Sequence, residues 1–409
     1  MTARALDQTV LREWRGGWRA VLAAGVGVAT GVTFYSYLGS FFIKPYVAEF
    51  GWTRGQIAFS AFSTLSAGLF APFVGRLADR FGVRLIVALS TLGYAGVTIG
   101  MAHQSGDIRV YYGLCFLLVL FGIGTGTVVW SRLISQRFER SRGLALSIGL
   151  SMITITATIG PMVLQAFMDA HGWRSAWLAL GAFAVACAVI AILIAPPDVG
   201  RDPPAPTEAV AANLKEAART PAFWLAFIGM LLINIPSGGI MNQMAALIAD
   251  KGFSAQEAAQ VVSTFGLSVL IGRIATGVSL DLFPARFVAF ATMAAPAVGC
   301  FLMTGQGAEV AGGVVAGIVL AGLSQGAEGD VGPYIMARRF GLKAIGGMIG
   351  ALATATAAGT ACGAILFAQT HDRTGSYDFA LYVGVAAFLA GAFCYLAIGE
   401  GHGHGRRAH

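Results

Sequence analysis

The strongest candidate for a functional residue in this sequence is a charged side chain inside a long apolar run. Arg273 lies within the apolar run 255–280, eight residues before Asp281. A charged side chain there is costly unless it is paired or faces water, so it marks a functional site by default. Its guanidinium stays ionised and can hold a carboxylate through two parallel hydrogen bonds. The residue therefore predicts a site for an anionic group, with a permanent structural ion pair as the alternative.

Two acidic residues in another apolar run are expected at nearly the same depth as Arg273. Glu328 and Asp330 lie 8 to 10 residues before Arg338. Side chains two residues apart on a helix point about 200° apart, so only one of the two can face Arg273. The other needs a different partner. Each is a candidate to accept a proton when an anion occupies Arg273, or to form a gating ion pair, and Gln325 on the same face favours Glu328 as the proton acceptor.

Further polar residues in the apolar runs could contact an anionic solute. Lys44, at the end of the first run, could attract an anion or extend its ammonium group to the lipid headgroups. Tyr35 and Asn242 could hydrogen-bond a hydroxyl, keto or carboxyl oxygen, and Tyr334 is expected on the same pathway. Together with Arg273 these form the predicted substrate-binding set.

The elements that position these residues follow from composition. The chain is 56% hydrophobic and 11% charged, with a mean hydropathy of +0.72, so a soluble fold would expose large apolar patches. Crossing a bilayer takes about 20 apolar residues in a helix, whereas a barrel strand shows alternation over about 10. The long, non-alternating runs predict an all-α membrane protein with twelve transmembrane helices. Their expected ranges are 18–43, 55–75, 84–103, 110–135, 143–166, 174–195, 221–249, 255–280, 287–305, 309–337, 345–369 and 377–398.

The distribution of charge predicts the orientation. The first run is too long for the apolar part of a cleaved signal peptide, so it is expected to remain as a helix. About 20 of the 27 lysines and arginines then fall on the cytoplasmic side if both termini are cytoplasmic. A bacterial-type inner membrane and a monomer are expected. The net charge of +7 fits this bias and contact with anionic lipids, and it gives no reason to expect nucleic acid.

Enzymatic and cofactor chemistry find no support in the sequence. The five cysteines lie inside apolar runs without the close spacing of a metal or redox motif. Paired histidines at metal spacing, a Ser/His/Asp arrangement and a phosphate-binding loop with a lysine are not found. The sequence therefore predicts a protein that is not an enzyme and uses no cofactor, metal or ATP.

A polar, proline-rich stretch divides the chain into two similar halves. We expect an N-terminal six-helix bundle at 1–195, a cytoplasmic linker at 196–220, a C-terminal six-helix bundle at 221–398 and a tail at 399–409. Three short patterns recur between the halves at a spacing of 201 or 202 residues. The pairs are 49–53 with 250–254, Gly75 and Asp79 with Gly277 and Asp281, and 137–138 with 339–340. The halves are therefore predicted to be copies of one six-helix unit.

The most distinctive pattern combines charge and glycine between the second and third runs, at 75–84. Gly75 would allow two helices to approach closely. Asp79 could pair with an arginine or a helix N-terminus in one conformation only, and Arg80 continues the charged segment. The second copy keeps Gly277 and Asp281 without the basic continuation. These residues are expected to form a gate rather than a substrate site.

Twelve helices in two repeats with this motif in the second loop resemble the major facilitator superfamily over the whole chain. Within it, the segments 41–45, 49–54 and 337–342, together with Arg273, resemble the monocarboxylate and oxalate:formate transporter group. That resemblance implies a carboxylate substrate, moved with a proton or exchanged for another anion. Val269 departs from the group, because animal monocarboxylate transporters have an acidic residue one turn before the arginine.

These observations predict a secondary transporter for a small monocarboxylate, working by alternating access and coupled to a proton. An exchanger of organic anions similar to the oxalate:formate type stays open as an alternative. Efflux of another small molecule also stays open, although it would leave Arg273 without an evident role.

Overall fold

Helices account for all the regular structure in the described part of this chain. The structure is a computed structural model that describes residues 3–30, 32–197, 216–305, 311–340 and 345–398. By its internal contacts the chain forms two units, and the first comprises Met1–Pro45 and Ser66–Asp202. The second comprises Tyr46–Leu65 and Pro203–His409. The linker and tail predicted from the sequence lie largely outside the described residues, and the predicted domain boundaries stay a prediction.

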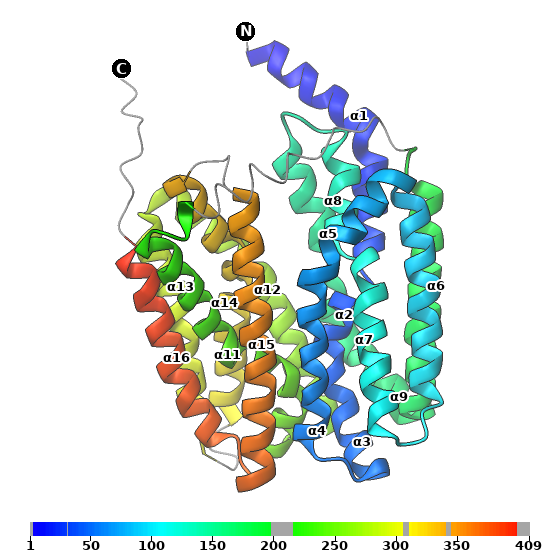
Figure 1. The fold of residues 1–409 in the computed structure, drawn as a ribbon, viewed down its shortest axis with the longest axis vertical. Helices are drawn as coiled ribbons and strands as arrows, with labels where there is room; N and C mark the ends of the chain where they lie inside the picture. Colours follow the sequence, from blue (N-terminus) through cyan, green and yellow to red (C-terminus); the bar gives the residue numbers. More distant parts are fainter. Residues whose placement is uncertain (1–2, 31, 198–215, 306–310, 341–344, 399–409) are drawn as a thin grey trace. The chain divides into compact units, whose positions relative to one another are not determined.

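The first unit contains the helices of the N-terminal half, coloured blue to green in Figure 1. They are α1 (Ala3–Val28), α2 (Val32–Leu38), the 3₁₀ helix η1 (Gly39–Phe42), α3 (Ile43–Phe50), α5 (Ser63–Phe81), α6 (Val83–Ala102), α7 (Ile108–Gly124), α8 (Thr127–Ser135) and α9 (Arg142–Ile194). Helix α3 begins in this unit and ends in the second. Buried alanine, valine and aromatic side chains from α1, α5, α6, α8 and α9 form one core cluster, with Trp130 and Phe138 among its largest members.

The second unit contains the helices of the C-terminal half, coloured green to red in Figure 1, and by its contacts a short segment of the N-terminal half. Its elements are α4 (Arg54–Phe59), the 3₁₀ helix η2 (Ser60–Phe62), α11 (Pro221–Asp250), α12 (Ala255–Leu282), α13 (Ala285–Leu302), α14 (Ala311–Phe340), α15 (Ile345–Thr374) and α16 (Asp378–Ala397). Helix α11 packs on α15 and α16, and α14 packs on α12 and α13.

The predicted all-α membrane fold is confirmed. Nine helices in the described residues are long and apolar enough to cross a membrane. Three predicted spans are assembled from shorter helices: the first from α1 to α3, the second from α4 and α5, and the fourth from α7 and α8. Helix α9 contains two spans that meet at Gly172, where the backbone is not helical.

One repeated pattern has the same local structure in both halves. Thr53 and Ser254 each begin a helix with a capping box, in which the cap side chain and the third helical residue satisfy free backbone N–H groups reciprocally. Each cap follows a glycine with positive φ, Gly51 at 67° and Gly252 at 98°. Residues other than glycine rarely adopt this backbone conformation. The 201-residue spacing thus relates two equivalent helix starts.

Glycines bring the backbones of α12 and α14 into contact. A Cβ added to Gly326 would lie 2.1 Å from the carbonyl oxygen of Val269, and one added to Gly272 would lie 2.2 Å from that of Leu323. Such close approach is the usual means by which helices associate in a membrane, where the hydrophobic effect does not drive them together. This contact brings Arg273 on α12 close to α14.

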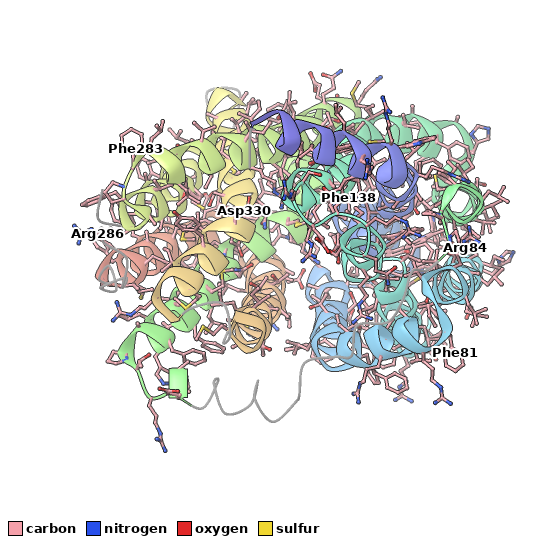
Figure 2. All side chains as sticks on the ribbon, turned by 90° about the horizontal axis from the view of Figure 1, so that it is seen from above. Phe81, Arg84, Phe138, Phe283, Arg286 and Asp330 are labelled. Atoms are coloured by element: carbon pink, nitrogen blue, oxygen red, sulfur yellow. The ribbon has the colours of Figure 1, made fainter. Side chains whose placement is uncertain are left out.

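An acidic side chain of α1 satisfies the backbone N–H groups that precede α9. The carboxylate of Glu13 accepts hydrogen bonds from the N–H groups of Glu139, Arg140 and Ser141 and from the Ser141 hydroxyl. Burial acts to raise the pKa of Glu13, and these hydrogen bonds outweigh it and lower the pKa to about 2. Phe138, labelled in Figure 2, packs edge-on against Trp14 at 5.2 Å between ring centres. Both contacts attach α1 to the loop before α9.

Candidate functional site

Arg273 on α12 forms an ion pair with Asp330 on α14. The Nε of Arg273 lies 3.6 Å from Oδ2 of Asp330, which is labelled in Figure 2. The two side chains are 41% and 45% exposed, so both are partly accessible. An ion pair with this exposure contributes little to stability, typically below about 1 kcal/mol. The pair can therefore be exchanged for another carboxylate at small cost.

The hydrogen-bonding capacity of Arg273 is largely unused. Its Nε is buried and has no hydrogen-bond acceptor among the described residues, because Asp330 is beyond hydrogen-bond distance. A guanidinium carries five N–H donors in a planar arrangement that matches a carboxylate. Gly329 adds no side chain here, and a Cβ at that position would lie 3.4 Å from Nη2 of Arg273. The geometry leaves the arginine able to bind an anion more closely than it binds Asp330.

Glu328 lies in a different environment from Asp330. Its side chain is buried, with 3% of the residue exposed, and no cation forms a salt bridge with it among the described residues. Asn234 on α11 donates to Oε1 at 2.6 Å, and Gln325 donates to Oε2 at 3.3 Å. Burying a carboxylate charge beside neutral donors alone is costly, whereas burying the protonated acid is not. The position is therefore suited to a carboxyl group that holds a proton.

The two acidic residues are separated as their helical spacing predicts. Asp330 follows Gly326 by one turn, so both lie on the face of α14 that meets α12. Glu328 lies on the face that meets α11, where Asn234 also contacts Thr356 of α15 at 3.4 Å. Thr356 was not among the predicted residues, since threonine is common in membrane helices and its sequence context carries no signal.

The predicted gate residues are described in part. In the first copy, the guanidinium of Arg132 on α8 donates to the carbonyl oxygen of Gly75, and Arg80 is exposed with its guanidinium 5.3 Å from the Phe81 ring centre. In the second copy, Gly277 is exposed, and a Cβ added to it would have no neighbour within 4 Å outside its own helix turn. The side chains of Asp79 and Asp281 lie outside the described residues. The roles assigned to this set stay predictions.

The remaining predicted binding residues are dispersed over both units. In the first unit, Tyr35 is half-buried with its ring 5.3 Å from that of Trp177, and Lys44 is exposed. In the second unit, Asn242 and Tyr334 are half-buried, and Asn242 accepts a hydrogen bond from Gln243 at 3.2 Å. The structure thus brings together Arg273 with Asp330 and Glu328 with Asn234. The part of the chain that is described contains no group of three metal-binding side chains.

Comparison with known proteins identifies the family. Residues 24–307 match the sequence profile of the Major Facilitator Superfamily. The chain is 27% identical to human monocarboxylate transporter 11 over 406 residues, covering 94% of this chain and 83% of that protein. It is 25% identical to a gallate transporter of Pseudomonas putida over 294 residues, covering 61% and 63% of the two chains.

Solved structures share the fold. The nucleoside transporter NupG superposes with a TM-score of 0.76 at 12% identity, covering 93% of this chain and 98% of that one. A bacterial homologue of the human lysosomal transporter Spinster superposes with a TM-score of 0.68 at 15% identity, covering 94% and 97%. Together with the multi-pass helical structure, these matches show that the chain is a membrane transporter, not an enzyme, and belongs to the Major Facilitator Superfamily.

Proposed function

We propose that this transporter moves a small monocarboxylate together with a proton by alternating access. The observation that carries the proposal is Arg273, a membrane-embedded and half-exposed arginine whose ion pair with Asp330 is long and whose Nε lacks an acceptor. In a transporter of uncharged solutes, such a residue would need another role, such as a permanent structural ion pair. The relatives named as transporters of monocarboxylates and of gallate, an aromatic carboxylate, support the same class of solute.

In this proposal the solute carboxylate displaces Asp330 from the guanidinium of Arg273. The exchange is favourable because a bidentate contact at hydrogen-bond distance replaces an ion pair at 3.6 Å. Tyr35, Lys44, Asn242 and Tyr334 are proposed to contact the rest of the solute or to attract it.

Glu328 is the proposed proton carrier. Its burial without a cation among the described residues favours a protonated side chain in the described conformation, whereas the two amide donors favour the carboxylate and so make it able to release the proton. Release of the proton requires water or a cation to reach the side chain, which a change in the packing of α11 against α14 would supply. Asp330, once displaced from Arg273, is the second candidate.

Uptake by substitution variants in proteoliposomes tests the role of Arg273. We expect Arg273→Ala to abolish uptake of labelled lactate, pyruvate and gallate, and Arg273→Lys to retain only a small fraction, because lysine cannot form the bidentate contact. Arg286→Lys, at the beginning of α13, is the matched control and should transport like the parent protein. Unaltered uptake by Arg273→Ala would refute the proposed carboxylate site.

The same assay separates coupling modes. Accumulation driven by an imposed inward proton gradient supports symport, whereas stimulation by internal anion alone would make the protein an exchanger. Sensitivity of the termini to protease from one side of the vesicle tests the proposed cytoplasmic location of both ends in a bacterial inner membrane. The transporting unit is proposed to be a monomer.

A further inference from the structure

A short segment of the N-terminal half belongs by its contacts to the second unit. The chain leaves the first unit at Pro45, and residues Tyr46–Leu65 pack with the second unit before the chain returns at Ser66. The 3₁₀ helices η1 and η2 lie just before and near the end of this segment. Short 3₁₀ stretches within a longer helical run often mark hinges. A reorientation of the two units must therefore bend these junctions or release the segment from the second unit.

Arg54 makes the strongest polar contacts of this segment. Its Nη1 lies 2.6 Å from Oδ2 of Asp250 at the end of α11, and its Nη2 lies 3.2 Å from Oδ1 of the same carboxylate. The Arg54 side chain is only 11% exposed. Nε2 of His371 on α15 contacts the same Asp250 oxygen at 3.0 Å. Burial lowers the pKa of Arg54, while Asp250 and Tyr377 raise it by more, so the guanidinium stays charged.

Two more residues of the second unit complete these contacts. Asp372 accepts hydrogen bonds from the backbone N–H of Arg54 at 3.0 Å and of Gly55 at 2.7 Å. The hydroxyl of Tyr377 accepts a hydrogen bond from Arg54 and donates to Gln243 at 3.2 Å. We call Arg54, Asp250, His371, Asp372 and Tyr377 the Arg54 cluster.

The segment also has apolar contacts with α15, made by small side chains. Ala58 and Ala61 pack against alanines of α15. These small side chains bury little area each and let the two helices approach closely. The Arg54 cluster supplies the polar part of the attachment, beside the buried side chains of Tyr46, Trp52 and Ile57.

The second half of the chain shows that Arg54 is not needed to form the capped helix. The equivalent capping box at Ser254 is followed by Ala255, which stands where Arg54 stands in the first half. Thr53 and Gln56 form the first capping box between themselves. Arg54 is thus free of a local folding role, and its contacts are made with residues 196 to 323 positions away.

We propose that the Arg54 cluster reversibly holds the segment Tyr46–Leu65 on the second unit, and that its release is a required step of transport. Gln243 connects the cluster to the solute site, because its amide also donates to Asn242, one of the predicted solute ligands. A solute oxygen beside Asn242 can replace Asn242 Oδ1 as the acceptor for the Gln243 amide, and the resulting movement of the Gln243 side chain would shift the Oε1 atom that accepts from Tyr377. The proposal rests on the transport function proposed above.

A reversible covalent tether tests whether release is required. A Cβ at Gly55 would lie 3.3 Å from Cγ of Gln369, so Gly55→Cys with Gln369→Cys can form a disulfide between the segment and α15. The same Cβ would lie 2.8 Å from Oδ2 of Asp372, so the effect of displacing that carboxylate is measured in the Gly55→Cys single variant. We expect oxidation of the double variant to abolish uptake of lactate, pyruvate or gallate, and reduction to restore it. Each single cysteine variant is the control for the native cysteines. Full uptake with the disulfide verified by mass spectrometry would overturn the proposal.

Hydrogen exchange measures the attachment without any solute, so it separates failure of this proposal from failure of the proposed function. We expect Arg54→Gln and Asp250→Asn each to raise the exchange rate of amides 54–62 by about 10-fold to 100-fold, because a charged hydrogen-bonded contact is lost. The double variant should exchange little faster than either single variant, since both substitutions remove the same ion pair. Arg109→Gln, which removes an exposed arginine at the beginning of α7, should leave these amides unaffected. Unaltered exchange in Arg54→Gln would also overturn the proposal.

Discussion

Glu328 and Asp330 show how two residues of like chemistry acquire different surroundings through helix geometry. Asp330 faces an arginine and is half-exposed, whereas Glu328 is buried with two amide donors. The separation follows from their spacing, and the different roles proposed for them rest on the partners that α12 and α11 supply.

Glu328→Gln should uncouple transport from the proton. Glutamine preserves the size of the side chain but cannot gain or lose a proton. We expect proton-driven accumulation to fall at least about 10-fold while exchange of labelled for unlabelled solute persists, because Arg273 is intact. Parallel measurement of both modes in proteoliposomes checks this. If this variant still accumulates solute in response to a proton gradient, Glu328 is not the proton carrier and Asp330 becomes the candidate.

At the scale of elements, close backbone contact between α12 and α14 positions the site. Gly326→Ala should disrupt it, because the new Cβ would lie 2.1 Å from the Val269 carbonyl oxygen and 2.7 Å from the Arg273 nitrogen. Both neighbours are backbone atoms that cannot rotate away. We expect the free energy of unfolding to fall by about 1–3 kcal/mol. We also expect the variant to lose uptake.

Gly312→Ala is the matched control in the same helix, because nothing lies within 4 Å of its new Cβ. Alanine favours helix over glycine, so this variant should be neutral or more stable by up to about 1 kcal/mol. Thermal unfolding in detergent compares the pair. Equal effects of the two substitutions would contradict the packing argument.

The contact of α1 with the start of α9 predicts a pH dependence. The pKa of Glu13 is lowered from 4.5 to about 2, so its contribution to stability is fully present above pH 4.5 and is lost as the pH falls toward 2. Glu13→Gln should lower stability by about 1 kcal/mol at pH 7, as loss of a helix cap does. The difference between the variant and the parent should shrink with acidity. Thermal midpoints measured between pH 7 and pH 3 check the sign.

At the scale of the whole molecule, the coupling mode determines the response to voltage. A monocarboxylate that enters with one proton carries no net charge, so uptake should not change when a potential of 100 mV is imposed. Entry of the anion alone would change by about 2.3 kcal/mol, or a factor of about 50. Uptake into vesicles with a potassium diffusion potential distinguishes these cases.

Much of this molecule follows from sequence because the membrane restricts the alternatives. Apolar runs long enough to span the bilayer must be helices there, so the helices and the family were predictable. The partners of Glu328 and Arg54 were not, because Asn234 and Asp250 lie 94 and 196 residues away from them. Helical spacing fixes the face on which a side chain lies, but only the packing of helices fixes what it meets. The identity of the solute stays a prediction.

The placement of Tyr46–Leu65 also bears on how the protein is made. Arg54 and Tyr377 are separated by 323 residues, so the ribosome adds the second long after the first. At a translation rate of about 5–20 residues per second, roughly 15 to 65 s pass between the synthesis of Arg54 and that of Tyr377. During that interval a buried arginine, two backbone N–H groups and an alanine surface are without their native contacts. The segment Tyr46–Leu65 therefore cannot make its native contacts until the last helices of the chain have been synthesised.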